Sequence, residues 1–210
     1  MNIITSGTRS IVALAIAGVA VAGCSSPMPA MSSMPSAPPT SPATGAPSAS
    51  RNDADITFAQ GMIVHHQQAV EMARLAAGRS QNTQVLDLAT RIGAAQTPEI
   101  QTMTGWLEKW GQMPPATGSM PGMNHAPTSG TDSVSGSMTT EQMQQLTQAS
   151  GVAFDRMFLE MMIEHHQGAI TMSQTEVTSG SDVDAKKLAQ NIITAQQTEI
   201  GEMDTLLTRL

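Results

Sequence analysis

The sequence is poor in the residues on which disulfide frameworks and nucleic-acid interfaces depend. It has one cysteine, no tyrosine, two tryptophans and three phenylalanines. A single cysteine excludes a disulfide framework within the chain. The longest basic run is Lys186-Lys187 and the net charge is −7. Because nucleic-acid binding depends on neutralising phosphates, nucleic acid is not an expected partner.

Long apolar runs are also absent, apart from residues 11–22, which follow Arg9 and end at Gly23 and Cys24. This run has the length of a secretory signal and is too short for a stable transmembrane helix. Small residues before a cysteine resemble a bacterial lipoprotein signal, in which Cys24 becomes the lipidated (palmitate-bearing) first residue. We therefore expect a lipoprotein signal peptide at 1–23 and an extracytoplasmic protein anchored to the cell membrane. The alternative is an ordinary signal peptide with a chance cysteine.

Two stretches have compositions that do not support a packed core. Residues 24–52 are mainly Ser, Pro, Ala and Thr, and residues 112–138 are rich in Pro, Gly and Ser. Such composition offers too little apolar surface to offset the entropy of ordering. We predict a disordered tether at 24–52 and a linker at 112–138.

The dominant feature of the remaining chain is a segment that occurs twice, one hundred positions apart. Four of the five histidines lie in this repeat, as two adjacent His-His pairs. An internal repeat of this kind constrains the whole fold. The first copy comprises Asp55, Phe58, Met62, Ile63, His65, His66, Gln67, Ala69 and Met72, followed by Leu88, Ala89, Ile92, Ala95, Gln96, Glu99, Ile100 and Met103, and each recurs at its number plus one hundred.

Apolar residues in both copies recur in steps of three and four, which indicates amphipathic helices. We predict helices over 53–79, 83–110, 140–149, 152–177 and from about 182 to the end. Two helical hairpins, each with one apolar face, must cover one another. The sequence therefore predicts an all-α, antiparallel four-helix bundle over 53–210, with repeat one at 53–111 and repeat two at 139–210.

The hairpin turns allow the polar residues of this bundle to be aligned. If the first turn is centred near residue 81, His66 lies beside Gln96 and Met62 beside Glu99. The same alignment around residue 181 places His166 beside Gln196, and Met162 beside Glu199. Four histidines, two glutamates and two methionines should then meet at mid-height. Asp55 and Asp155 are interpreted as first-turn acids that complement the helix dipole, or else as outer ligands.

Two interpretations of this polar layer are open. One is a structural network of hydrogen-bonded histidines and glutamates that fixes helix register. The other is a metal site, which the duplicated His-His pairs with nearby methionines favour. No Glu-x-x-His motif is present, which argues against a ferritin-type di-iron centre. Imidazole with thioether ligands suits Cu(I), and imidazole also suits Cu(II) and other transition metals.

The pattern Asp-x-x-Phe-x-x-x-Met-Ile-x-His-His-x-x-Ala-x-x-Met, which begins at Asp55 and again at Asp155, resembles the bacterial family called domain of unknown function 305. The resemblance covers nearly all of 53–210 and implies a ferritin-like four-helix fold. It also implies copper binding, because some members are secreted copper-binding proteins. Carried over by position, it implicates as metal ligands His65, His66, His165, His166, Met62, Met162, Met72 and Met172.

The function expected is a membrane-anchored, extracytoplasmic protein that binds or buffers copper, with Cu(I) favoured over Cu(II). Met28, Met31, Met34, Met120, Met123 and His125 are read as weak copper-capture arms, or else as low-complexity drift. No nucleophile, base triad or cofactor loop points to an enzyme. The alternatives are a metal-dependent redox enzyme similar to a cuprous oxidase, and a metal-free helical interaction domain. The sequence does not identify a protein partner.

Overall fold

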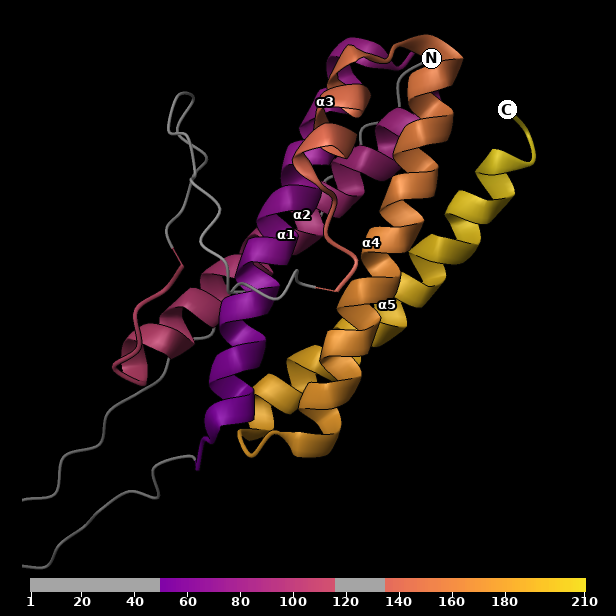
Figure 1. Ribbon diagram of the computed structural model, residues 1–210. Helices are drawn as coiled ribbons and strands as arrows, with labels where there is room; N and C mark the ends of the chain where they lie inside the picture. Colours follow the sequence, from indigo (N-terminus) through magenta and orange to yellow (C-terminus); the bar gives the residue numbers. More distant parts are fainter. Residues whose placement is uncertain (1–49, 116–134) are drawn as a thin grey trace, which may run out of the picture. The chain divides into compact units, whose positions relative to one another are not determined.

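The computed structural model describes residues 50–115 and 135–210, and all regular structure in these ranges is helical (Figure 1). The predicted all-α class is therefore confirmed, with helix ends that agree with the sequence pattern to within about three residues. Cys24 and the methionines and histidine of the expected capture arms lie outside the described residues. The helices are α1 (Asp53–Arg79), α2 (Thr83–Lys109), α3 (Thr140–Gln148), α4 (Gly151–Ser179) and α5 (Val183–Leu207).

Side-chain caps define where the long helices begin. The Asn52 side chain accepts hydrogen bonds from the backbone N–H groups of Ala54 and Asp55, and Asp55 accepts one from the backbone of Asn52 in return. This reciprocal capping box satisfies donors that the first turn leaves free. Asp182 caps α5 in the simpler way, by accepting from the N–H groups of Asp184 and Ala185. Asp55 thus lies in the first turn as expected, whereas Asp155 does not, because α4 begins earlier, at Gly151.

The helices form two hairpins, α1 with α2 and α4 with α5, and the hairpins meet mainly through α1 and α4. These two helices run antiparallel beside each other in Figure 1. The outer helices α2 and α5 touch at few positions. One of these is an ion pair between Arg91 and Glu202, whose partly exposed side chains should contribute less than about 1 kcal/mol.

Two apolar clusters make up the core, and along α1 and α4 they lie on either side of the histidines. Each cluster takes its phenylalanines from one repeat and combines them with aliphatic residues of both repeats, as a pseudo-twofold axis requires. A fully buried side chain of this size stabilises the fold by about 1.5–3 kcal/mol. One cluster includes Phe58, Met62, Met103, Leu107, Ala169, Ala189 and Ile192, and the other Phe158, Met162, Met203, Leu206, Ala69, Ala89 and Ile92.

Residues 135–138, which we call the 135–138 segment, break this symmetry by packing across α1 and α4. The side chain of Gln68 makes two hydrogen bonds with the backbone of Met138, at 2.7 and 2.9 Å. Gly136 has a positive φ of 76° and lies against Gly168 so closely that a Cβ on either glycine would overlap the other segment's backbone. These residues lie at the end of the 112–138 linker predicted from the sequence. They are instead fixed against the two central helices.

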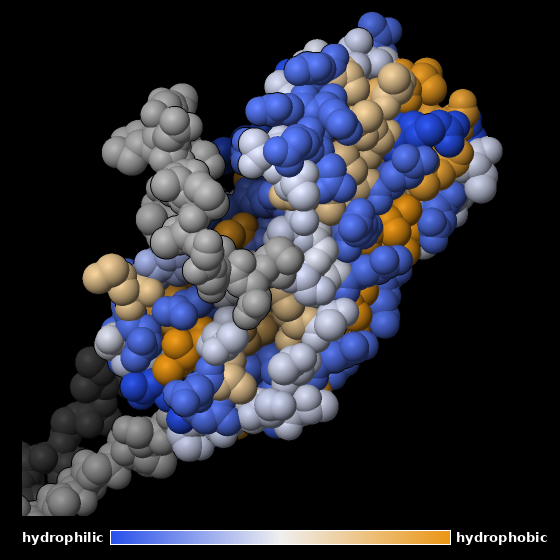
Figure 2. Space-filling view, in the orientation of Figure 1, coloured by the Kyte–Doolittle hydropathy of each residue, from blue (hydrophilic) through white to orange (hydrophobic). Residues whose placement is uncertain are grey.

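The surface that faces the viewer in Figure 2 is mostly polar, with apolar areas between the polar side chains. Large exposed apolar residues in the described ranges are scattered on different helices, such as Val64 on α1 and Val183 on α5. Isolated apolar residues of this kind are normal on a soluble surface. Within residues 50–115 and 135–210, no helix combines the length and the apolar character needed to cross a membrane.

Candidate metal centre

The two His-His pairs lie at the middle of α1 and α4, and all four side chains are fully buried. Successive residues on a helix point about 100° apart, so the two rings of a pair face different neighbours. The first ring of each pair faces the other repeat. His65 and His165 meet between α1 and α4, with ring centroids 3.6 Å apart and ring planes inclined by 39°. The site is therefore shared between the two halves of the chain.

The second ring of each pair faces the outer helix of its own hairpin. Nε2 of His66 lies 2.7 Å from Oε2 of Glu99 on α2, and Nε2 of His166 lies 2.6 Å from Oε2 of Glu199 on α5. Alignment about the turn predicted Gln96 as the neighbour of His66, three residues from the observed partner. The offset arises because helical side chains lean toward the N-terminus of their own helix. In an antiparallel pair of helices, two side chains that touch therefore belong to residues slightly closer to the C-terminus of each helix than a simple alignment gives.

Five of the six remaining ring nitrogens are buried without a hydrogen-bond partner, and Nε2 of His65 is the exception. Nε2 of His65 lies 3.1 Å from the backbone carbonyl oxygen of Ser135. A carbonyl only accepts, so this nitrogen must carry the proton and Nδ1 must hold a lone pair. His165 has no partner of normal hydrogen-bond geometry on either nitrogen. Unpartnered Nδ1 atoms occur in all four rings, those of His65, His66, His165 and His166.

Burial keeps the two facing histidines neutral. Removal from water lowers the pKa of His65 to about 3, and the neighbouring His66 ring lowers it further, while the Ser135 carbonyl opposes the shift. Burial also holds the pKa of His165 well below its usual value, with the nearby His65 ring as the next cause. At neutral pH both rings are uncharged. Neutral imidazole is the form that binds metal ions.

The four methionines named from the sequence divide between the two apolar clusters. Met62 and Met172 belong to the cluster around Phe58, and Met72 and Met162 to the cluster around Phe158. Met62, Met72 and Met162 are fully buried, and Met172 is partly buried. Each cluster thus brings one methionine from either repeat to one side of the histidine layer.

The glycine at position 61, where the second repeat has Met161, makes room for Met172. A Cβ at Gly61 would lie 3.2 Å from the terminal methyl carbon of Met172. Among the described residues, no three His, Cys, Asp or Glu side chains converge as a metal-binding group by themselves. A metal ion in this layer would therefore bind few imidazoles at once and would need thioether ligands to complete its coordination.

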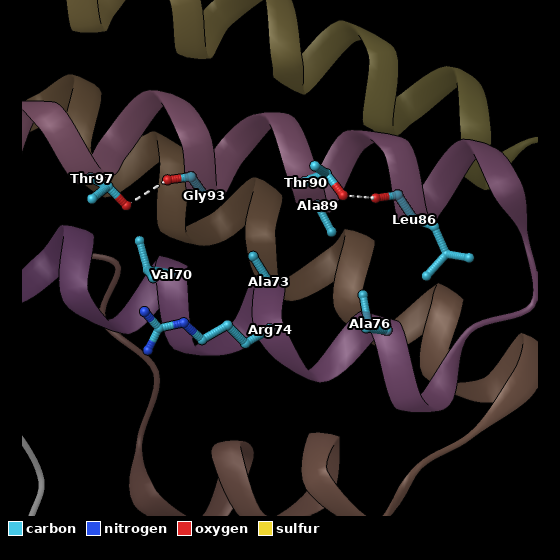
Figure 3. A pocket seen from close by; sticks show the side chains of 10 residues that line it. Val70, Ala73, Arg74, Ala76, Leu86, Ala89, Thr90, Gly93 and Thr97 are labelled. Carbon is cyan, nitrogen blue, oxygen red and sulfur yellow. Dashed lines mark hydrogen bonds between the residues drawn. The ribbon is translucent and has the colours of Figure 1, made fainter.

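Two surface cavities lie apart from the histidines. The larger, about 330 Å³, is a groove between α1 and α2, lined by small residues such as Ala73, Ala76 and Gly93 with Arg74 at its edge (Figure 3). The other, about 320 Å³, is lined by residues that include Phe58, Met172 and Glu176. Neither lining contains a histidine, and the four repeat histidines are fully buried.

A buried pair of carboxyl groups at one end of the bundle has no equivalent in the other repeat. Asp55 accepts hydrogen bonds from the backbone N–H groups of Ser181 and Asp182, at 3.0 and 2.9 Å, and so ties α1 to the turn before α5. Asp155 is buried as well, but one of its oxygens has no partner. Beside Asp55 lies Glu176, which is 1% exposed and occupies the position of an alanine in the first repeat.

The two acids of this pair have pKa values shifted in opposite directions. Burial, followed by hydrogen bonding and charge repulsion with Asp55, raises the pKa of Glu176 to about 8, although the nearby Lys186 opposes the shift. Burial acts to raise the pKa of Asp55, but the hydrogen bonds that Asp55 accepts outweigh it and the net pKa is lowered. Glu176 has no partner of strict hydrogen-bond geometry. The proton that Glu176 retains at neutral pH removes the charge repulsion with Asp55.

Sequence reasoning missed Ser135 and Glu176, although both had a weak signal. Glu176 is an acidic residue on the apolar face of its helix, where the first repeat has alanine. Gly168, which lies against Ser135, replaces a glutamine of the first repeat. Departures from an internal repeat mark positions where the two halves meet different surroundings. Here those surroundings are Asp55 in one case and the 135–138 segment in the other.

Solved structures similar to this chain include two copper-bound forms of one protein. CopM in a Cu(II)-bound form is 29% identical, with a TM-score of 0.60, and the match covers 74% of this chain and 96% of that chain. CopM is similar in its Cu(I)-bound form also, at 29% identity and a TM-score of 0.59, with the same coverage. A protein from Streptomyces coelicolor, provisionally described as secreted, is 31% identical with a TM-score of 0.65, over 74% of this chain and 91% of that chain.

Sequence comparison gives a consistent assignment. A protein from Acanthamoeba polyphaga mimivirus, L153, is 47% identical over 53 residues, which is 25% of this chain and 35% of that protein. The match thus spans about a third of that relative. Residues 55–207 match the family described as "Domain of unknown function (DUF305)". The chain therefore belongs to the DUF305 family, as its paired His-His repeats indicated.

Proposed function

We propose that this protein binds copper, with Cu(I) favoured over Cu(II), in the histidine layer between its two halves. Its role would be to buffer or scavenge copper outside the cytoplasm and so contribute to copper tolerance. The observation that carries the proposal is the set of four fully buried imidazoles whose Nδ1 atoms have no partner. Other transition metals with an affinity for imidazole are alternatives for the same site.

The donor set fits a soft ion. A buried polar atom without a partner costs about 1–3 kcal/mol, and four such atoms lie in one layer. A purely structural network would satisfy these atoms, whereas here only the Nε2 side of three rings is bonded. One or more bound ions, each held by few imidazoles together with thioethers, would accept these lone pairs and remove the penalty. The proposed ligands are His65, His66, His165 and His166, with the thioethers of Met62, Met162, Met72 and Met172 on either side.

The ligand chemistry favours the cuprous state. Thioether sulfur is a soft ligand that selects Cu(I), and imidazole binds either oxidation state. CopM, a similar structure, is known in Cu(I)-bound and Cu(II)-bound forms and in a silver-bound form. Silver and cuprous ions share the soft, monovalent character that thioethers prefer. Binding and release are proposed in place of turnover, because the four histidine side chains are fully buried.

The proposed location is outside the cytoplasm, with attachment to the membrane by a lipid on Cys24. The support is the signal-like run at 11–22 and the small residues before the cysteine. The similar protein from Streptomyces coelicolor is provisionally described as secreted. Mass spectrometry of the mature protein from a bacterial membrane fraction tests this directly. An unmodified cysteine, or a mature chain that starts elsewhere, would contradict lipid attachment.

The experiment that tests copper binding is a competition titration of the mature protein against a chromophoric Cu(I) chelator. A variant with alanine at all four repeat histidines should lose most of the affinity, with its fold checked by circular dichroism. The control replaces Gln101 and Gln197, exposed residues of α2 and α5, by alanine and should bind as the parent does. The proposal is wrong if the fourfold variant binds Cu(I) as tightly as the parent protein.

A second variant separates the sulfur ligands from the imidazoles. Leucine at Met62, Met72, Met162 and Met172 preserves side-chain volume, so it should cost the fold little. We expect it to weaken Cu(I) binding at least tenfold and to leave Cu(II) binding nearly unchanged. Equal affinity of this variant and the parent for Cu(I) would remove the thioethers from the ligand set.

A further inference from the structure

The pairs His66–Glu99 and His166–Glu199 are equivalent contacts in the two repeats. In each, a fully buried ring bonds through Nε2 to a glutamate on the neighbouring helix, at 2.7 and 2.6 Å. The glutamate side chains are 23% and 15% exposed, so their other edges reach the protein surface. Each glutamate therefore links a buried imidazole to the solvent side of its hairpin.

We propose that Glu99 and Glu199 are positioning residues, which hold His66 and His166 in the tautomer that presents the Nδ1 lone pair to the metal. The inference rests on the proposed function, because it assigns a role in the same site. A carboxylate accepts hydrogen bonds and does not donate them. Nε2 of each ring must then carry the proton, and Nδ1 is left as the only nitrogen able to bind an ion.

A carboxylate in this position would do more than select a tautomer. It fixes the orientation of the ring about its bond to Cβ, and its negative charge makes the imidazole a more basic ligand. If the acceptor were absent, the proton could occupy either nitrogen and the ring could turn. A ring with its proton on Nδ1 has no lone pair directed into the layer and could not bind the ion there.

The third tethered ring supports this reading independently. His65 is held through the same nitrogen, Nε2, by the backbone carbonyl of Ser135 in the 135–138 segment. Three acceptors from three different elements thus leave the same atom, Nδ1, free in three rings. Nε2 is the ring nitrogen farthest from the backbone, so it is the one that reaches these acceptors, and Nδ1 is left as the common candidate ligand atom.

The first measurement uses the metal-free protein, so it does not depend on copper binding. Long-range ¹H–¹⁵N correlation spectra distinguish a protonated from an unprotonated ring nitrogen. In the parent, we expect His66 and His166 to show protonated Nε2 and unprotonated Nδ1. In E99L/E199L, which offers no acceptor, we expect a mixture of tautomers or a change to protonated Nδ1. The proposal is overturned if the Nε2-protonated form persists unchanged in that variant.

The second measurement is Cu(I) affinity by chelator competition. Loss of a carboxylate that orients a metal-binding histidine typically costs about 10–100-fold in affinity, and we expect a loss in this range for E99L/E199L. The variant E99Q/E199Q retains an amide acceptor and should recover part of the affinity. The control E108Q/E160Q changes two exposed glutamates of α2 and α4 and should match the parent. An affinity of E99L/E199L equal to that of the parent overturns the proposal.

The two measurements separate this inference from the proposed function. If the parent protein binds no Cu(I), the copper proposal fails, and the spectra of the metal-free protein still show whether the glutamates set the tautomer. If the parent binds Cu(I) and E99L/E199L loses only thermal stability, with tautomers and affinity unchanged, the glutamates have a structural role alone. A correlated change in tautomer and affinity supports the positioning role.

Discussion

Substitution of Glu176 by glutamine should make the stability of this protein less sensitive to alkaline pH. Glu176 is 1% exposed and lies beside Asp55, and the charged groups that face it are Asp55 on α1, Asp182 before α5 and Lys186 on α5. Burial, and next the interaction with Asp55, raises its pKa from 4.5 to about 8. The folded protein therefore holds a proton at neutral pH that the unfolded chain releases.

The sign and size of the effect follow from this difference in bound protons. Because the folded pKa of Glu176 lies above the unfolded value, its protonated form contributes stability that is fully present below about pH 4.5 and is lost as pH rises through about 8. At about 1.4 kcal/mol per pKa unit, the upper limit is about 5 kcal/mol. The carboxylate can gain water by a small local opening, so we expect about 1–3 kcal/mol. Asp55 acts in the opposite sense below about pH 4, since its pKa is lowered.

Urea unfolding followed by circular dichroism, at half-unit steps from pH 5 to pH 9, measures this directly. The parent should lose stability across the range, and Glu176→Gln should lose clearly less and be the more stable protein at pH 9. Glu71→Gln, an exposed substitution on α1, is the control and should follow the parent. Parallel curves for the parent and Glu176→Gln would refute the raised pKa of Glu176.

Two further predictions concern the 135–138 segment and metal binding. A Cβ on Gly168 would lie 2.0 Å from the Ser135 carbonyl oxygen, so Gly168→Ala should displace the segment and cost about 1–3 kcal/mol by urea unfolding. Gly93→Ala, with no atom within 4 Å of its Cβ, should instead gain up to about 1 kcal/mol, and equal losses would contradict the contact. Free Cu(I) at a hundred times its Kd should stabilise the protein by about 2.7 kcal/mol in thermal melts, and an unchanged melting temperature would argue against binding to the folded state.

Much of the fold was predictable because the apolar pattern repeats without a gap. Steps of three and four residues mark the helices, and the duplication implies that two hairpins share one core. The convergence of the His-His pairs with Glu99 and Glu199 followed from the same alignment, with an error of three residues in the exact partner. That error was unavoidable from spacing alone, since it depends on the lean of side chains along each helix.

The features that sequence did not predict are those that break the repeat. The contact of Ser135 with His65 depends on where a Pro- and Gly-rich stretch returns to the helices, and local composition does not encode such a long-range contact. The tie from Asp55 to the turn at Ser181 and Asp182 is equally non-local. The sequence does contain Gly136 and Gly168, which permit this close contact, but a glycine can occur at a position for many structural reasons.

The contact between His65 and His165 has a consequence for how such a chain can be built. A polypeptide with one hairpin would need to meet a second copy of itself to bring these rings together, in a self-complementary twofold arrangement. Joining both hairpins in one chain turns that encounter into an intramolecular one. The assembled ring pair then persists at any dilution, and each half becomes free to diverge, as Glu176 and Gly168 already have.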